Sequence, residues 1–180
     1  MSEDQYFNDH IPHRVNLLTT FRDRYSRRRG GRVAAHRPEQ SWDQPRDFFR
    51  FSKDISILMV RFFCDELGLH LPEKASEPKD RRERDGKPWQ PHFKCKQFTV
   101  ADAKKDKRKF SSLVAVLKAA NRAVAHINKL DVDHGFKTQA DHEPLFDVID
   151  WIESLIETHM YEPNGNRSLS AAMQLQNNVM

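Results

Sequence analysis

The residues best suited to chemistry lie in one helical stripe in the second half of the chain. Lys118, Arg122 and His126 follow one another at intervals of four, which places them on the same side of a helix. An imidazole can transfer a proton near neutral pH, and a guanidinium can stabilise charge that develops on phosphate oxygens. With Asn121 beside it, the stripe predicts a phosphodiester site, although an ordinary solvated helix face has the same spacing.

A second basic segment lies near the N-terminus. From Arg14 to Arg37 the chain has eight arginines and one acidic residue, Asp23. Arginine forks match the geometry of phosphate oxygens, so this segment predicts contact with nucleic acid. The residues that we expect to make such contacts are Arg24, Arg27, Arg28, Arg29, Arg32 and, in the later stripe, Lys118. An acidic protein partner, and pairing with the acidic segment 131–162 of the same chain, are the alternatives.

We predict no metal site and no cofactor. Cys64, His70, His92 and Cys95 lack the paired spacing of a zinc site. The Asp and His residues within 131–142 are also what a turn and a helix N-cap require. The chain has no phosphate-binding glycine loop, no nucleophile elbow and no dinucleotide fingerprint, which leaves NTPase, α/β-hydrolase and Rossmann functions unsupported.

The segment Asn121-Arg122-Ala123-Val124-Ala125-His126, which ends a long helix and precedes an acidic one, resembles HEPN domains, in particular those associated with abortive infection. The resemblance implies an all-α protein, commonly a homodimer. It also implies a metal-independent ribonuclease of a defence or toxin–antitoxin system, with His126, Arg122 and neighbouring Asn121 at its catalytic site. The spacing departs from the family, because three residues separate Arg122 from His126 where the family has four to six. A helical protein that binds RNA or another protein without cutting is therefore the alternative.

Four segments with helical periodicity must position these residues. Apolar side chains recur every three or four positions over residues 11–25, 48–62, 110–127 and 141–156. Pro12 suits a first helical turn, Gly30-Gly31 and Gly68 suit helix ends, and Asp141 suits an N-cap. We therefore predict an all-α fold, an antiparallel bundle of four long helices that forms one domain over residues 1–162.

Two segments lie outside the predicted helices. Residues 71–107 contain prolines and a charge run, which predicts a long loop between the second and third helices. Within it, Trp89, Phe93 and Phe98 indicate that the second half packs against the domain. Residues 163–180 are polar and predict a flexible C-terminal tail.

Composition limits the class of protein. The 180 residues are 38% hydrophobic and 31% charged, with a net charge of +4, which suits one compact domain and is too mild to identify a partner. Two cysteines favour a reducing compartment. The chain has no apolar run of membrane-spanning length, and its first residues, Met1-Ser2-Glu3-Asp4, do not resemble a signal peptide. We expect a cytoplasmic protein without membrane contact.

Overall fold

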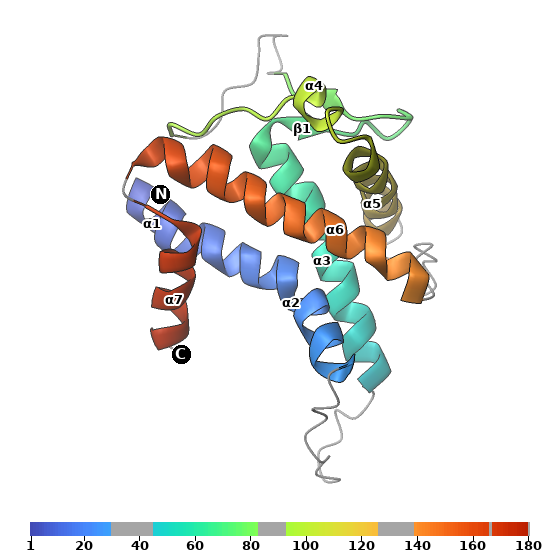
Figure 1. The fold of residues 1–180 in the computed structure, drawn as a ribbon, viewed down its shortest axis with the longest axis horizontal. Coiled ribbons are helices and arrows are strands. Elements are labelled where there is room, and N and C mark those ends of the chain that lie inside the picture. The colour runs from blue at the N-terminus through green and yellow to red at the C-terminus, as the bar shows by residue number, and fades with distance from the viewer. Residues whose placement is uncertain (30–44, 83–92, 126–138, 166, 180) are drawn as a thin grey trace.

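The computed structural model describes residues 1–29, 45–82, 93–125, 139–165 and 167–179, and these are mostly helical, as predicted (Figure 1). The long helices overlap the four periodic segments of the sequence. They are α2 (Ile11–Arg29), α3 (Pro45–Leu67), α5 (Lys107–Ala125) and α6 (Gln139–Ile156). Gly68 follows α3 with a φ of 96°, a backbone conformation that favours glycine and ends the helix as predicted.

The first helix begins earlier than Pro12. A short helix, α1 (Glu3–Gln5), and a π-helical turn, η1 (Tyr6–His10), lead directly into α2. The side chain of Ser2 accepts a hydrogen bond from the Gln5 amide, and the Gln5 side chain accepts one from the Ser2 amide, which together cap the helix start. Pro12, which has no N–H to donate, is the second residue of α2 and lies just beyond the wider turn η1.

The four long helices share one core but not one axis. In Figure 1, α2 and α6 lie alongside each other across the view, α3 crosses them steeply, and α5 is seen nearly end-on. Helix α3 contacts each of the other three, so it is central to the packing. The helical class is therefore confirmed, whereas the antiparallel four-helix bundle stays a prediction.

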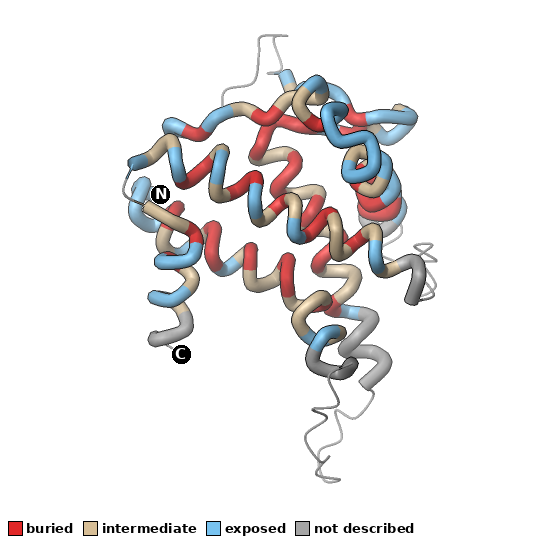
Figure 2. Tube along the Cα trace, in the orientation of Figure 1, coloured by how far each residue is buried: buried red, intermediate tan, exposed pale blue. Residues whose placement is uncertain are grey.

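Each long helix buries one side, shown in red in Figure 2. The buried apolar residues of these helices include Val15, Leu18, Phe21, Ile57, Val60, Phe63, Leu67, Leu113, Val116, Leu117, Ala120, Leu145, Val148, Ile149 and Ile152. In α3 the periodic stripe through Phe51, Ile55, Leu58 and Phe62 is not the buried face. Phe51 is 59% exposed, and Ile57, Val60 and Phe63 are buried instead. Burial of apolar area, at about 25 cal/mol per Å², is the main stabilising contribution of these faces.

Residues 71–107 contain structure of their own. Strands β1 (Leu69–His70) and β2 (Lys79–Asp80) pair as a short antiparallel hairpin, and α4 (Val100–Ala103) follows. Phe98 is buried, as expected, and its backbone N–H donates to the carbonyl of Leu67 at 2.8 Å. Phe93 is 43% exposed, and Trp89 lies outside the described residues.

Where the sequence predicted a tail, the chain folds back on its own beginning. Helix α6 continues into a π-helical turn, η2 (Glu157–Tyr161), and a 3₁₀ turn, η3 (Glu162–Asn164). Helix α7 (Leu169–Val179) then packs against η1 and α2. Leu169 and Ala172 are buried there, and the Gln176 side chain donates to the Asp9 carbonyl at 3.0 Å. The helical spacing of these apolar residues supplies the packing face.

Candidate nucleic-acid interface

The second half of α5 has one buried and one exposed side. Leu113, Leu117 and Ala120 are in the core, whereas Lys118 and Arg122 are exposed. Residues four apart lie one turn apart on the same side of a helix, so these two cations are neighbours on the outer face of α5. Helix α5 thus carries two basic side chains, one turn apart, on its outer face.

Asn121 holds a second segment of the chain against this face of α5. Its side-chain amide Nδ2 donates to the backbone carbonyl of Leu71 at 3.2 Å, and the Leu71 side chain is buried. These two contacts hold the segment after β1 against α5. Asn121 is therefore a positioning residue for the segment that forms the opposite wall of the site.

Helix α5 and this segment enclose a shallow pocket of about 460 Å³, which we call the α5 pocket. It is lined by Leu71, Glu73, Lys74, Ala75, Ser76, Lys118, Asn121 and Arg122. Lys74 and Lys118 form no ion pair or side-chain hydrogen bond within the described part of the chain. Three cations against one carboxylate, that of Glu73, make the pocket positive and suited to phosphate groups.

Lys74 is the residue that sequence reasoning missed. It lies in the segment interpreted as a long loop, and no periodicity connects it with α5. Its place beside Lys118 depends on the Asn121–Leu71 hydrogen bond and on the hairpin that turns the chain back. No local sequence signal identifies such a neighbour.

Several predicted site residues lie outside what the structure describes. His126 and Arg32 belong to undescribed segments. Arg27, Arg28 and Arg29 end α2, whose backbone is described there while their side chains are not. The structure thus brings together Lys118, Asn121 and Arg122, and the roles of the other residues stay predictions.

The arginine-rich end of α2 is partly used inside the protein. Arg22 pairs with Asp150 and Glu153 of α6, and its Nε lies 3.1 Å from the carboxylate of Asp23. Burial alone would lower the pKa of Arg22, but its hydrogen bonds to Glu153 and Asp150 raise that pKa above its usual range. Pairing with the chain's own acidic segment, one of the alternatives, is confirmed for Arg22. Arg24, one helical position beyond Asp23, is exposed.

The cysteines have the character of core residues. Cys64 and Cys95 are both buried free thiols. Burial raises the pKa of Cys95 to about 11 and moves the pKa of Cys64 further above its ordinary value. Zinc binds the thiolate form, which these environments disfavour. Within the described residues, no group of three or more His, Cys, Asp or Glu side chains is placed to hold a metal ion.

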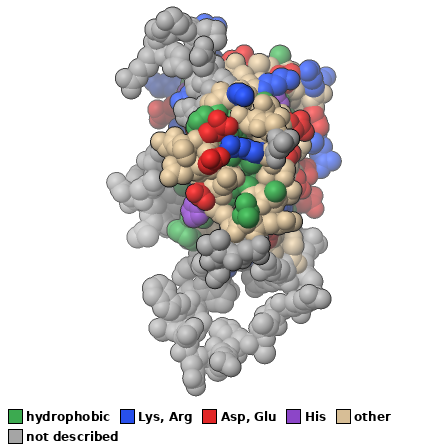
Figure 3. Space-filling view, turned by 90° about the vertical axis from the view of Figure 1, so that its left-hand side faces the viewer, with side chains coloured by type: hydrophobic (Ala, Val, Ile, Leu, Met, Phe, Trp, Pro, Cys, Tyr) green, Lys and Arg blue, Asp and Glu red, His purple; other side chains and the backbone are tan. Residues whose placement is uncertain are grey.

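Charge on the surface differs from face to face. Figure 3 shows the side of the molecule on which α1 and α7 lie, where acidic and basic side chains are mixed. Arg167 illustrates this mixing, because its guanidinium pairs with the carboxylates of Glu3 and Asp4. A face with paired charges of both signs offers a polyanion little attraction, in contrast to the α5 pocket.

The chain matches no protein-family model, and no curated protein or solved structure shows significant similarity to it. None of the described helices combines the length and the apolar character needed to cross a lipid bilayer.

Proposed function

We propose that this protein binds RNA through the α5 pocket and cleaves it without a metal ion. The observation that carries the proposal is the convergence of Lys74, Lys118 and Arg122, from two segments, on one hollow. Cations that face solvent in a group bind the phosphate backbone and release its counterions. The resemblance of residues 121–126 to HEPN domains favours RNA among the polyanions that such a pocket would attract.

In this proposal His126 is the proton-transfer group. Cleavage without a metal requires the 2′-hydroxyl of RNA as the nucleophile. His126 accepts the proton of that hydroxyl, O2′ attacks phosphorus, the bond from phosphorus to the 5′ oxygen breaks, and the departing 5′ oxygen takes a proton from water. Arg122 stabilises the negative charge that develops on the phosphate oxygens. The products are a 2′,3′-cyclic phosphate and a 5′-hydroxyl end, so DNA of the same sequence is bound but not cut.

The proposal includes a homodimer in which the four long helices are arranged as in a HEPN bundle. It rests on the same resemblance, which implies that two protomers combine their motifs in one cleft. Sedimentation velocity of the full chain at micromolar concentration tests this part separately. A monomer that still cleaves RNA would contradict the shared cleft without affecting the RNA site.

Binding is tested by fluorescence anisotropy of a labelled single-stranded RNA over a salt series. Replacing Lys118 and Arg122 together by Met removes two cations of the pocket. We expect about a tenfold or greater loss of affinity at low salt, and a reduction of the slope of log K against log salt by about 1.4, since each single-strand phosphate contact contributes about 0.7. Lys107→Met, at the exposed other end of α5, is the matched control.

Two results of the same titration decide the proposal. Equal affinities for wild type and the Lys118/Arg122 variant would refute the α5 pocket as the RNA site. If replacement of Arg27, Arg28 and Arg29 by Met instead abolished binding, the non-catalytic alternative at the end of α2 would be favoured, because that end presents exposed Arg24 beside them.

Cleavage is tested on the same RNA in the presence of EDTA. We expect wild type to cut and His126→Ala to bind RNA with unchanged affinity but not to cut it. Placing a 2′-deoxy nucleotide at the cleavage position should protect that bond. Full activity of His126→Ala, or loss of activity in EDTA, would refute the catalytic assignment and leave RNA binding to be judged by the titration.

A further inference from the structure

The β1–β2 hairpin is held rigidly although it is very short. Two paired residues on each strand are too few for a hairpin to be stable alone. Here the N–H of Arg81 donates to the carbonyl of Gly68 at 2.8 Å, and the carboxylate of Asp80 accepts from the backbone N–H of Val100 at 2.7 Å. Leu69 is buried in the core. The hairpin is thus fastened to α4 and to the hydrophobic core, and one further hydrogen bond extends its ladder.

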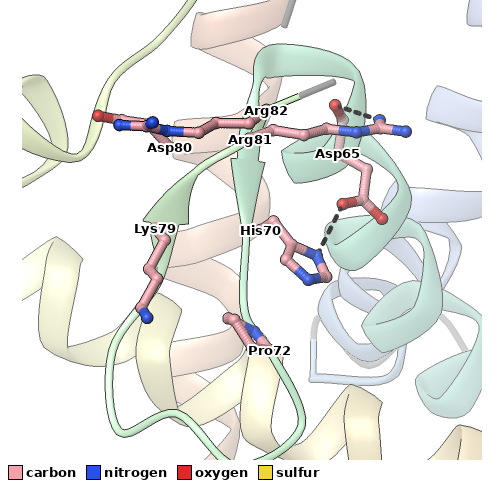
Figure 4. A pocket seen from close by; sticks show the side chains of 7 residues that line it. All are labelled: Asp65, His70, Pro72, Lys79, Asp80, Arg81 and Arg82. Carbon is pink, nitrogen blue, oxygen red and sulfur yellow. Dashed lines mark hydrogen bonds and ion pairs between the residues drawn. The ribbon is translucent and has the colours of Figure 1, made fainter. Parts of the chain in front are cut away.

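The register of the hairpin pairs a histidine with a lysine, whose side chains extend to different sides in Figure 4. His70 pairs directly with Lys79, and residues directly opposite in an antiparallel pair lie on the same face. Both line a hollow of about 610 Å³, which we call the hairpin pocket. It is lined by Asp65, His70, Pro72, Lys79, Asp80, Arg81 and Arg82 (Figure 4).

Asp65, near the end of α3, orients two of these side chains. Its carboxylate Oδ1 lies 3.5 Å from Nδ1 of His70, and its backbone carbonyl accepts a hydrogen bond from the guanidinium of Arg81 at 3.0 Å. Figure 4 shows His70 and Arg81 both reaching from the hairpin toward Asp65. Because Nδ1 of His70 faces the carboxylate, Nε2 is the ring nitrogen that remains for a ligand.

Two of the three cations that line the hairpin pocket, Lys79 and Arg82, are exposed. Lys79 and Arg82 have no ion pair or side-chain hydrogen bond to any residue that the structure describes. The two carboxylates of the pocket each have a contact, that of Asp80 with the backbone N–H of Val100 and that of Asp65 with His70, and the three cations outnumber them. A pocket with cations to spare and an oriented imidazole has the composition of a site for a compact, doubly charged anion.

We propose that the hairpin pocket binds a phosphate monoester, either of a free nucleotide or at the end of an RNA strand. The volume suits a nucleotide-sized ligand. Lys79 and Arg82, whose exposed side chains extend to different sides in Figure 4, turn onto the phosphate oxygens when the ligand binds, and Nε2 of His70 donates a further hydrogen bond when both ring nitrogens carry hydrogen, since Nδ1 faces Asp65. This site is distinct from the α5 pocket and stands whether or not the protein cleaves RNA.

The two pockets share one segment. Residues 73–76 line the α5 pocket, while Pro72 and residues 79–82 line the hairpin pocket. An RNA strand whose terminal phosphate occupies the hairpin pocket can therefore continue across this segment toward Lys118. This geometry makes an RNA end and a free nucleotide the two sources that the experiment must separate.

Isothermal titration calorimetry of the full chain tests the site with adenosine 5′-monophosphate, and with adenosine as the ligand that lacks phosphate. In a parallel measurement, anisotropy compares one RNA with a 5′-phosphate and with a 5′-hydroxyl. We expect the phosphate to improve binding by about tenfold, the equivalent of one well-made charged contact. If the phosphate improves the affinity only of the mononucleotide, the natural ligand is a free nucleotide. If it improves the affinity only of the RNA, the ligand is a strand end. No improvement in either pair would overturn the proposal.

Substitutions show where the phosphate binds. We expect Lys79→Met with Arg82→Met to remove the preference for phosphate, whereas Lys118→Met in the α5 pocket leaves it intact. Lys79 and Arg82 make no side-chain contact that the fold needs, so the double variant should keep the melting temperature and circular dichroism of wild type. A preference unchanged in this variant, or lost equally in Lys118→Met, would refute the hairpin pocket, and the latter result would place the phosphate in the α5 pocket.

Discussion

Arg22 provides the sharpest test of how the basic segment is used. If its role is the ion pairing seen with α6, then Arg22→Met should destabilise the fold and leave RNA affinity unchanged. The Arg22 side chain is 24% exposed and that of Glu153 28% exposed, so the pair is neither buried nor fully solvated. Breaking a fully buried pair costs about 3–5 kcal/mol and breaking an exposed one about 0–1 kcal/mol. We therefore expect a loss of about 2 kcal/mol.

Urea denaturation followed by circular dichroism measures this loss. With a slope of about 2 kcal/mol per molar urea, the midpoint should fall by about 1 M, and the melting temperature by about 4–8 °C. Arg108→Met is the matched control. Arg108, on α5, likewise pairs with a carboxylate of α6, that of Asp147 at 2.8 Å, but its side chain is 80% exposed. That control should lose at most about 1 kcal/mol.

The cost of Arg22→Met should also depend on pH. Burial raises the pKa of Glu153 above its ordinary value against the pull of Arg22, and removing Arg22 leaves burial unopposed. A carboxyl group whose pKa is raised by folding binds its proton more tightly in the folded state. The variant should therefore recover stability relative to wild type as the pH falls from 7 toward 4.5, where the unfolded carboxyl also becomes protonated.

A second substitution separates the pair from its parts. Arg22→Met combined with Glu153→Met leaves no partly buried Glu153 carboxylate without its partner, so we expect the double variant to be more stable than Arg22→Met alone. The reasoning is refuted if Arg22→Met costs no more than Arg108→Met. It is also refuted if Arg22→Met weakens RNA binding while stability is unchanged.

Three further predictions concern stability. Tyr161→Phe removes the hydroxyl that donates to the buried Phe7 carbonyl at 2.6 Å, and should cost about 1–3 kcal/mol in urea denaturation. Gly165→Ala should lower the free energy of unfolding by about 1–3 kcal/mol, because Gly165 has a φ of 82°. A methyl group there would meet no atom within 4 Å, so backbone strain is the expected cause. A substitution without effect on stability would contradict that cause. Burial and Arg14 lower the pKa of His10, so the unfolded state binds the imidazole proton more tightly than the folded state. Stability should therefore fall as the pH drops below about 6.5. A His10→Gln variant should show a flatter dependence of stability on pH between pH 7.5 and 5.

Local sequence determined where the helices lie. Apolar residues every three or four positions marked α2, α3, α5 and α6, and glycine after α3 marked its end. These features depend on hydrogen bonds and side-chain contacts within about four residues, which a short stretch of sequence contains in full. The position of Lys118 and Arg122 on one exposed side of α5 follows from the same helical spacing.

Packing between distant segments decided the rest. Helix α3 carries apolar residues on more than one side, and only contact with its neighbours selected Ile57 and Val60 for the core over Phe51. Arg22 pairs with carboxylates of α6, and the hairpin places Lys74 in the same pocket as residues of α5. Asp65 and His70 are close in sequence, but the turn at Gly68 and the strand pairing set their side chains beside each other. Such contacts depend on how the whole chain closes its core, and no periodicity of three or four residues encodes them.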